Sequence, residues 1–245
     1  MHFKSHANIP VFVPHMGCPH LCVFCDQKSI SGEKDELTPE KAQNQIEEAL
    51  STLQGRRAEI AFFGGSFTAI EREKMIAFLA LASSYLKSGR VSGIRLSTRP
   101  DCVDEEILDI LSFYGVSAVE LGVQSLDEEV LKASGRRHSV KDTADACARI
   151  KQRGCFLLGC QMMLGLPAST REKELLTARE ICRMGADCTR IYPTVVLKDT
   201  PLEALWKKGL YRPLSLEEGV LRGADCFEIF ENAGVKVLRM GLCAE

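Results

Sequence analysis

Short runs of apolar residues alternate along the chain with segments in which apolar residues recur every three or four positions. The runs are rich in β-branched and aromatic residues and predict strands, whereas the periodic segments predict amphipathic helices. The expected strands are 9–14, 59–64, 93–98, 117–123, 156–164, 188–196 and, shorter, 235–240. The expected helices are 38–53, 71–87, 104–115, 139–154, 169–185 and 215–234. This alternation predicts an α/β fold with parallel strands and right-handed crossovers.

No repeat or linker interrupts the pattern, so we expect residues 1–245 to form a single domain. The sequence stops after the last expected strand, which favours a truncation at the C-terminus. The strand–helix units fit either a partly closed barrel or an open doubly wound sheet. In both architectures the ligand site lies at the carboxyl ends of the strands.

Composition narrows the class of protein. The formal net charge of −2 argues against a general nucleic-acid binder, although a local basic patch remains compatible with RNA. No signal peptide and no apolar run long enough to span a membrane is apparent, so we expect a cytoplasmic protein with reduced thiols. Eleven cysteines in such a compartment do not form a disulfide framework. Apart from a cluster of three near the N-terminus, we expect them to be small buried core residues.

Polar and glycine-containing motifs follow the expected strands one after another. They are "GCPHLCVFCDQ" (17–27), "GGSFT" (64–68), "STRPD" (97–101), "GVQS" (122–125), "GLP" (165–167) and "YPT" (192–194). Core packing does not explain why such residues collect at strand ends, whereas a shared ligand site does.

The cysteine cluster predicts a metal centre with an open position. A structural zinc takes four ligands, and Cys18, Cys22 and Cys25 supply three. A [4Fe–4S] cluster held by three cysteines leaves one iron free for a substrate or cofactor. Two alternatives stay open: a zinc site completed by His15 or His20, and a redox pair of Cys22 and Cys25.

Other candidate ligand contacts have structural alternatives. Gly64 and Gly65 let a ligand approach the backbone closely, or they form only a tight turn. Gln124 suits a ribose or amide, or it is a satisfied buried glutamine. Arg136 or Arg137 can clamp a carboxylate, or they lie in a solvated turn.

The spacing Cys18-x3-Cys22-x2-Cys25, with Phe24 before the last cysteine, resembles the signature of the radical S-adenosylmethionine (SAM) enzymes. "GGSFTAI", "STRPDC", "ELGVQSLDEEVL", "RRHSV", "QMMLGLP" and "IYPTVVLKDTPLEALWKKGLY" extend the likeness over nearly the whole chain. Together they look like the radical SAM portion of the elongator catalytic subunit, which modifies wobble uridine in tRNA. A looser likeness, through "GVQS" and "GLP", is to the oxygen-independent coproporphyrinogen oxidases.

The resemblance implies a partial (β/α)6 TIM-like barrel, a [4Fe–4S] cluster on the three cysteines and SAM on the fourth iron. It implies that the glycine turn and Ser66 face the SAM amino group, and that backbone near Phe24 faces the adenine. Gln124 and Arg136 are expected along the ribose and the methionine carboxylate. The full set of implied cofactor-binding residues is Phe24, Gly64, Gly65, Ser66, Ser97, Gln124 and Arg136.

The predicted function is that of a radical SAM enzyme that cleaves SAM reductively, with tRNA or another nucleic-acid base as substrate and a flavodoxin- or ferredoxin-type electron donor. Departures from the elongator motifs, such as "RRH" for "RGH", favour a different substrate, and the sequence ends before any acetyltransferase domain. The alternatives are a coproporphyrinogen-oxidase-like enzyme of tetrapyrrole metabolism and a non-catalytic metal-binding module that offers Trp206 and Tyr211 to a partner. Basic residues expected near the rim, where they could meet phosphates, are Arg95, Arg99, Arg136, Arg137, Lys198, Lys207 and Lys208.

Overall fold

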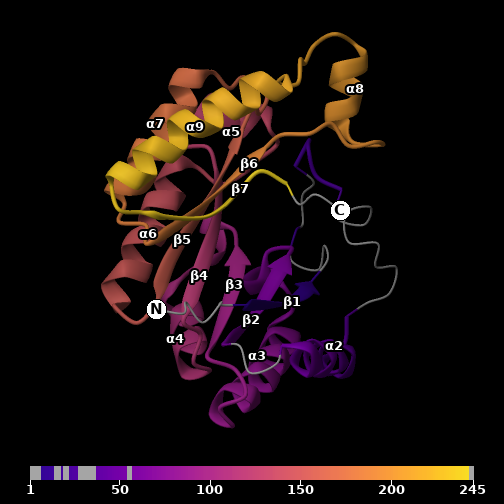
Figure 1. The fold of residues 1–245 in the computed structure, drawn as a ribbon, viewed down its shortest axis with the longest axis vertical. Coiled ribbons are helices and arrows are strands. Elements are labelled where there is room, and N and C mark those ends of the chain that lie inside the picture. Colours follow the sequence, from indigo (N-terminus) through magenta and orange to yellow (C-terminus); the bar gives the residue numbers. More distant parts are fainter. Residues whose placement is uncertain (1–6, 14–17, 19–21, 27–36, 54–56, 243–245) are drawn as a thin grey trace. The chain divides into compact units, whose positions relative to one another are not determined.

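The computed structural model describes residues 7–13, 18, 22–26, 37–53 and 57–242. Strands and helices alternate in these residues as the hydrophobic pattern predicts, and every expected strand is present (Figure 1). The strands are β1 (Ala7–Val13), β2 (Ala58–Gly64), β3 (Gly93–Thr98), β4 (Ala118–Gln124), β5 (Leu157–Leu164), β6 (Cys188–Pro193) and β7 (Lys236–Met240).

The expected helices are also present. They are α2 (Pro39–Thr52), α3 (Arg72–Lys87), α4 (Glu105–Phe113), α6 (Val140–Arg153), α7 (Arg171–Arg183) and α9 (Leu216–Asn232). Two short helices, α5 (Glu128–Ala133) and α8 (Pro201–Lys207), were not expected. Each begins at a capping side chain, Asp127 or Thr200, which accepts a hydrogen bond from a backbone N–H of the first turn.

The strands follow one another in the sheet in their sequence order, from β1 to β7. β1, β2 and β3 pair in parallel, as do β5, β6 and β7. Parallel neighbours require a crossover between them, which the intervening helices provide. The carboxyl ends of paired strands therefore lie at the same edge.

The chain divides into two compact units, each considered by itself. The first unit comprises Met1–Pro19, Gln27–Glu120 and Arg153–Phe156, and the second comprises His20–Asp26, Leu121–Gln152 and Leu157–Glu245. The short segment that carries Cys22 and Cys25 thus belongs to the second unit, although the chain on both sides of it belongs to the first.

In the first unit, α2 packs against β1 and α3, and α3 packs against β3. Aromatic contacts order the region just after β2. The Phe62 ring stacks on that of Phe67, with centroids 4.4 Å apart, and lies 6.1 Å from that of Phe78 on α3. All three side chains are buried, so the turn after β2 rests on a rigid apolar base.

Arg95 does not lie at the rim, and the expectation that it could meet phosphates is wrong. It is a buried residue of β3, and its side chain is 7% exposed. Nε donates to Glu59 at 3.0 Å and Nη1 donates to Glu120 at 2.9 Å. A guanidinium between two carboxylates is a buried ion-pair network of the core, because an unpaired charge there would be too costly.

In the second unit, α7 and α9 pack on each other, and α9 also contacts β5, β6 and β7. The expectation of buried cysteines is confirmed at four positions, namely Cys147, Cys160, Cys188 and Cys226. It is wrong for Cys155, which is exposed, and incomplete for Cys102 and Cys182, which are half-buried. Cys243 lies outside the described residues.

Candidate functional site

The chemically distinctive residues stand where strands end. Gly64 is the last residue of β2, Gln124 is the last of β4, and Gly165 directly follows β5. Because the carboxyl ends of parallel strands share an edge, each unit presents such residues on its own rim. The expected placement at strand ends is confirmed for these three positions. Most of the 17–27 motif lies outside the described residues, and the roles of the individual residues stay predictions.

In the first unit, the turn after β2 favours glycine for two reasons. Gly64 has a φ of 103°, which L side chains rarely adopt. A Cβ there would also lie 3.3 Å from the carbonyl oxygen of Val13. The Gly65 N–H donates to the same oxygen at 2.9 Å and ties the turn to the end of β1. Since Gly64 is exposed, the turn brings bare backbone to the surface, where a ligand can approach closely.

Behind this turn, three buried hydroxyl groups form a directed chain. Thr68 donates to the Cys102 carbonyl at 2.6 Å, which uses its single proton, so Thr98 donates to Thr68 at 2.6 Å. Ser66 therefore donates to Thr98 at 2.8 Å, and it accepts from the Arg99 N–H at 3.0 Å. The Ser66 side chain is 2% exposed and joins the turns after β2 and β3.

A guanidinium lies within electrostatic range of the first cysteine of the motif. Arg99 donates two hydrogen bonds to Asp101, at 2.9 and 2.7 Å. These bonds raise the pKa of Arg99, and the Cys102 and Cys18 thiol groups add smaller contributions of the same sign. Burial raises the pKa of Cys102. Ser97, the remaining candidate of this unit, is buried near the end of β3.

In the second unit, backbone hydrogen bonds fix the cysteine segment. The Cys25 N–H donates to the Cys22 carbonyl at 3.0 Å and closes a turn. Between them, the Val23 N–H donates to Ser134 at 3.1 Å, and the Val23 carbonyl accepts from the Leu202 N–H at 2.8 Å. The half-buried side chains of this segment include Cys22, Phe24 and Cys25. The motif is thus anchored by residues more than a hundred positions away.

Gln124 has two features of a ligand contact. Its φ of 65° places a non-glycine residue in the left-handed region, which costs on the order of 1–3 kcal/mol and is typical of functional sites. Its side-chain Oε1 is buried and accepts no hydrogen bond from the described residues. A buried acceptor without a donor is costly, and a bound hydroxyl or amide would satisfy it.

Arg136 follows the end of α5 and reaches the cysteine segment. Nη1 donates to the Cys22 sulfur at 3.5 Å, and Nη2 donates to the Gly122 carbonyl at 2.5 Å. Its Nε–H is buried and has no acceptor within the part of the chain that the structure describes. The buried Nε–H is therefore available to an anionic group such as a carboxylate.

These residues fit the cofactors that the resemblance implies. Three thiols suit an iron–sulfur cluster, the unused acceptor of Gln124 suits a ribose hydroxyl, and the unused donor of Arg136 suits a carboxylate. Cys18 belongs to the first unit, whereas Cys22 and Cys25 belong to the second. No three His, Cys, Asp or Glu side chains of the described residues are grouped to hold a metal ion, so the ligand role of the cysteines stays a prediction.

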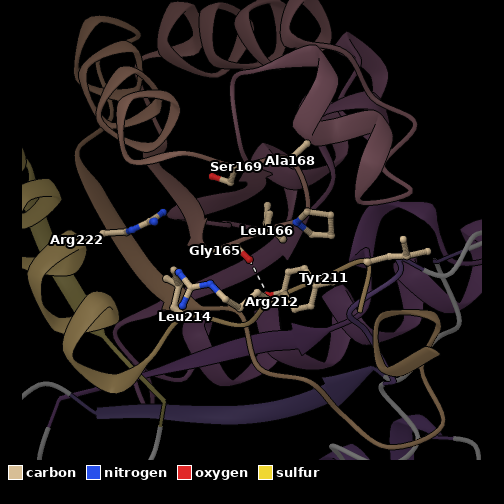
Figure 2. A pocket seen from close by; sticks show the side chains of 10 residues that line it. Gly165, Leu166, Ala168, Ser169, Tyr211, Arg212, Leu214 and Arg222 are labelled. Carbon is tan, nitrogen blue, oxygen red and sulfur yellow. Dashed lines mark hydrogen bonds between the residues drawn. The ribbon is translucent and has the colours of Figure 1, made fainter. Parts of the chain in front are cut away.

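A polar cavity of about 280 Å³ lies beyond the end of β5 in the second unit (Figure 2). Glu174, which is 3% exposed, orders the loop at this cavity: its carboxylate accepts from Gly165 N–H at 2.7 Å, from Ser169 at 3.0 Å and from Arg222 at 3.2 Å. Tyr211 donates to the Gly165 carbonyl at 2.7 Å, and burial raises the pKa of Tyr211 to about 12. The lining comprises Gly165, Leu166, Pro167, Ala168, Ser169, Leu210, Tyr211, Arg212, Leu214 and Arg222.

A second, apolar cavity of about 460 Å³ lies between the start of α9 and the ends of β5, β6 and β7. Leu216 and Val220 of α9 and Met240 of β7 line it and are exposed. Thr194, from the "YPT" motif, also lines it and is buried. This motif therefore lies beside an apolar surface.

Sequence reasoning missed Glu174 and Arg222, and it considered Tyr211 only as a partner surface. Trp206 on α8 is half exposed, as a role in binding a partner requires. The Tyr211 hydroxyl, in contrast, donates a hydrogen bond within its own unit. The available signal was a glutamate in the first turn of the helix that follows "GLP". That signal is weak, because acidic residues in a first helical turn usually interact only with the helix dipole.

Comparison with known proteins identifies the class. Residues 12–181 match the model of the Radical SAM superfamily, and residues 186–245 match that of the Radical_SAM C-terminal domain. The chain therefore belongs to the radical SAM superfamily. It is a radical SAM enzyme, and the cofactors of this family are a [4Fe–4S] cluster and SAM.

Relatives and a solved structure refine this assignment. The chain is 30% identical over 238 residues to an uncharacterized protein of Methanocaldococcus jannaschii, covering 90% of this chain and 71% of the relative. It is 28% identical over 243 residues to a tRNA uridine(34) acetyltransferase of Dehalococcoides mccartyi, covering 84% of this chain but only 52% of the relative. The Elp3 structure of Methanocaldococcus infernus has a TM-score of 0.70 at 22% identity, covering 98% of this chain and 60% of that one. The likeness in fold confirms the TIM-like partial barrel.

Among the helices that the structure describes, none has the length and hydrophobicity needed to cross a lipid bilayer.

Proposed function

We propose that the protein binds a [4Fe–4S] cluster through Cys18, Cys22 and Cys25 and cleaves SAM reductively. The observation that carries the proposal is the three-cysteine motif in a chain that belongs to the radical SAM superfamily. When bound and reduced, such a cluster would supply one electron for the reductive cleavage of SAM. The protein's own task is to bind SAM, orient it and exclude water.

Each candidate residue would contact a different part of SAM. The turn of exposed Gly64 and buried Gly65 would receive the SAM amino group, with Ser66 and Ser97 behind it. Backbone around Phe24 would receive the adenine. The unused oxygen of Gln124 would accept a ribose hydroxyl. The free Nε–H of Arg136 would donate to the methionine carboxylate, a charge-assisted bond that strengthens in a buried setting.

Anaerobic reconstitution tests the proposal. The wild-type protein should bind about four irons per chain and, after reduction with dithionite, should convert SAM to 5′-deoxyadenosine. Zinc in place of iron, or iron without SAM cleavage, would reject it.

We further propose that the substrate is tRNA, that a flavodoxin- or ferredoxin-type protein donates the electron, and that the enzyme works in the cytoplasm. Support for tRNA comes from relatives such as the tRNA uridine(34) acetyltransferase, of which the chain spans about half. No disulfide is formed among the cysteines of the described residues, which fits a reducing compartment.

The reduced enzyme should be incubated with SAM and total tRNA, and the digested nucleosides should be compared by mass spectrometry with a sample that lacks SAM. A modified uridine that depends on SAM supports tRNA. A shifted Soret band on addition of a coproporphyrinogen-type tetrapyrrole, with unchanged nucleosides, would favour the tetrapyrrole alternative instead. Parallel assays with flavodoxin, ferredoxin and dithionite identify the competent electron donor.

A further inference from the structure

A guanidinium donates directly to the sulfur of a proposed cluster ligand. Nη1 of Arg136 lies 3.5 Å from the Cys22 sulfur, within hydrogen-bonding range for a nitrogen donor and a sulfur acceptor. The bond to the Gly122 carbonyl fixes the orientation of the guanidinium plane. This contact uses a different nitrogen from the one that remains free for a carboxylate.

Local structure places Arg136 at this position. Helix α5 ends at Ala133, and Gly135 beyond its cap has a φ of 70° and reverses the chain. The Arg136 N–H then donates to the Leu131 carbonyl at 2.9 Å. The same loop accepts the Val23 N–H at the Ser134 carbonyl. Two bonds thus join one loop to adjacent residues of the cysteine segment, one from the backbone and one from the side chain. This double attachment keeps the Arg136 donor close to the Cys22 sulfur.

The chemical consequence follows from charge. Reduction adds one negative charge to an iron–sulfur cluster and its thiolates. Hydrogen bonds to the sulfurs and nearby positive charge favour the reduced form and raise the reduction potential. Arg136 supplies both, and its partial burial weakens screening by water.

We propose that Arg136 hydrogen-bonds the Cys22 thiolate of the cluster and raises its reduction potential, so that a physiological donor can reduce it. The inference rests on the proposed function, because it assumes that Cys22 is a cluster ligand. It gives Arg136 a role that is independent of SAM.

The test uses the reconstituted full chain without SAM, with the midpoint potential determined by dithionite titration followed by electron paramagnetic resonance. Arg136→Gln should lower the equilibrium constant for one-electron reduction about tenfold, which corresponds to about 59 mV toward more negative potential. Arg136→Lys retains the charge and should lie between the two. Arg137→Gln removes the same charge from the adjacent exposed residue and should leave the potential at the wild-type value.

An Arg136→Gln protein that carries a full cluster at the wild-type potential would overturn the inference and leave the proposed function intact. A wild-type protein that assembles no cluster would overturn both. If Arg136→Gln fails to fold, electron–nuclear double resonance on the reduced wild type decides. A strongly coupled exchangeable proton, present in H2O and lost in D2O, supports the N–H···S bond if Arg136→Lys weakens its coupling. Its absence rejects the bond.

Discussion

The polar groups at the strand ends of the two units differ in whether they have hydrogen-bond partners within the protein. In the first unit, the Ser66, Thr98 and Thr68 hydroxyls bond to one another and to backbone, and the exposed feature is the glycine turn. In the second, Gln124 and Arg136 each retain a buried polar atom that no described residue satisfies, and Gln124 is strained as well. The polar groups of the first rim are therefore satisfied within the protein, whereas two buried polar atoms of the second rim have no partner among the described residues.

The largest expected effect comes from the cysteines. Cys22→Ala should abolish both iron loading and 5′-deoxyadenosine formation, because two thiolates cannot retain the cluster. Cys155→Ala, at an exposed cysteine outside the proposed site, should retain both activities. Iron analysis and product chromatography check the pair. Equal iron content in the two variants would contradict the assignment of Cys22.

Next in size is the hydroxyl chain of the first rim. Thr98→Val leaves Ser66 and Thr68 buried without their partner and should lower the free energy of unfolding by about 1–3 kcal/mol, measured by urea denaturation. Thr98→Ser retains the hydroxyl and should lose less. If this rim is mainly a scaffold, the SAM affinity of folded Thr98→Val should fall less than that of the Gln124 variants. If Thr98→Val lost more free energy of SAM binding than free energy of unfolding, the view of this rim as a scaffold would be contradicted.

Gln124 should show opposite effects on stability and binding. Gln124→Gly relieves the left-handed strain and should raise the free energy of unfolding by about 1 kcal/mol, after allowance for the flexibility of glycine. It also removes the buried acceptor, so SAM affinity, measured by equilibrium dialysis, should fall about tenfold. Gln124→Ala retains the strain and should lose affinity without the gain in stability. A Gly variant that binds SAM with the wild-type affinity would contradict the role of the Gln124 oxygen in binding.

The smallest effect is expected beside the polar cavity. Tyr211→Phe removes the hydrogen bond to the Gly165 carbonyl and should cost about 0.5–1 kcal/mol at neutral pH. Because the pKa of Tyr211 is raised from 10.0 to about 12, its contribution is complete below pH 10 and is lost as the pH rises toward 12. Denaturation at neutral pH and above pH 10 should show the difference between wild type and variant shrinking. A constant difference would contradict this origin.

Most of the fold was predictable because each strand or helix carries its own periodic signal. The cap of α5 was missed although Asp127 stands before "EEVL", since one turn and a half leaves too little periodicity to detect. Without α5, the neighbourhood of Arg136 could not be derived, and its contact with Cys22 spans more than a hundred positions.

Arg95 shows the other limit. In "GIRLST" it looks like a strand residue close to a polar rim, yet its burial depends on Glu59 and Glu120 from neighbouring strands. Partners of this kind are set by register between strands, which a single sequence does not encode locally. Glu174 is a related case, because Arg222 of α9, 48 positions away in the sequence, donates to it along with Gly165 and Ser169 of the preceding loop.

The anchoring of Val23 by Ser134 and Leu202 has a consequence for biosynthesis. All three motif cysteines leave the ribosome early, but the segment with Cys22 and Cys25 acquires its shape only after residue 202 has been made. A metal that binds this segment would therefore meet its final geometry only after the chain up to residue 202 has been synthesised.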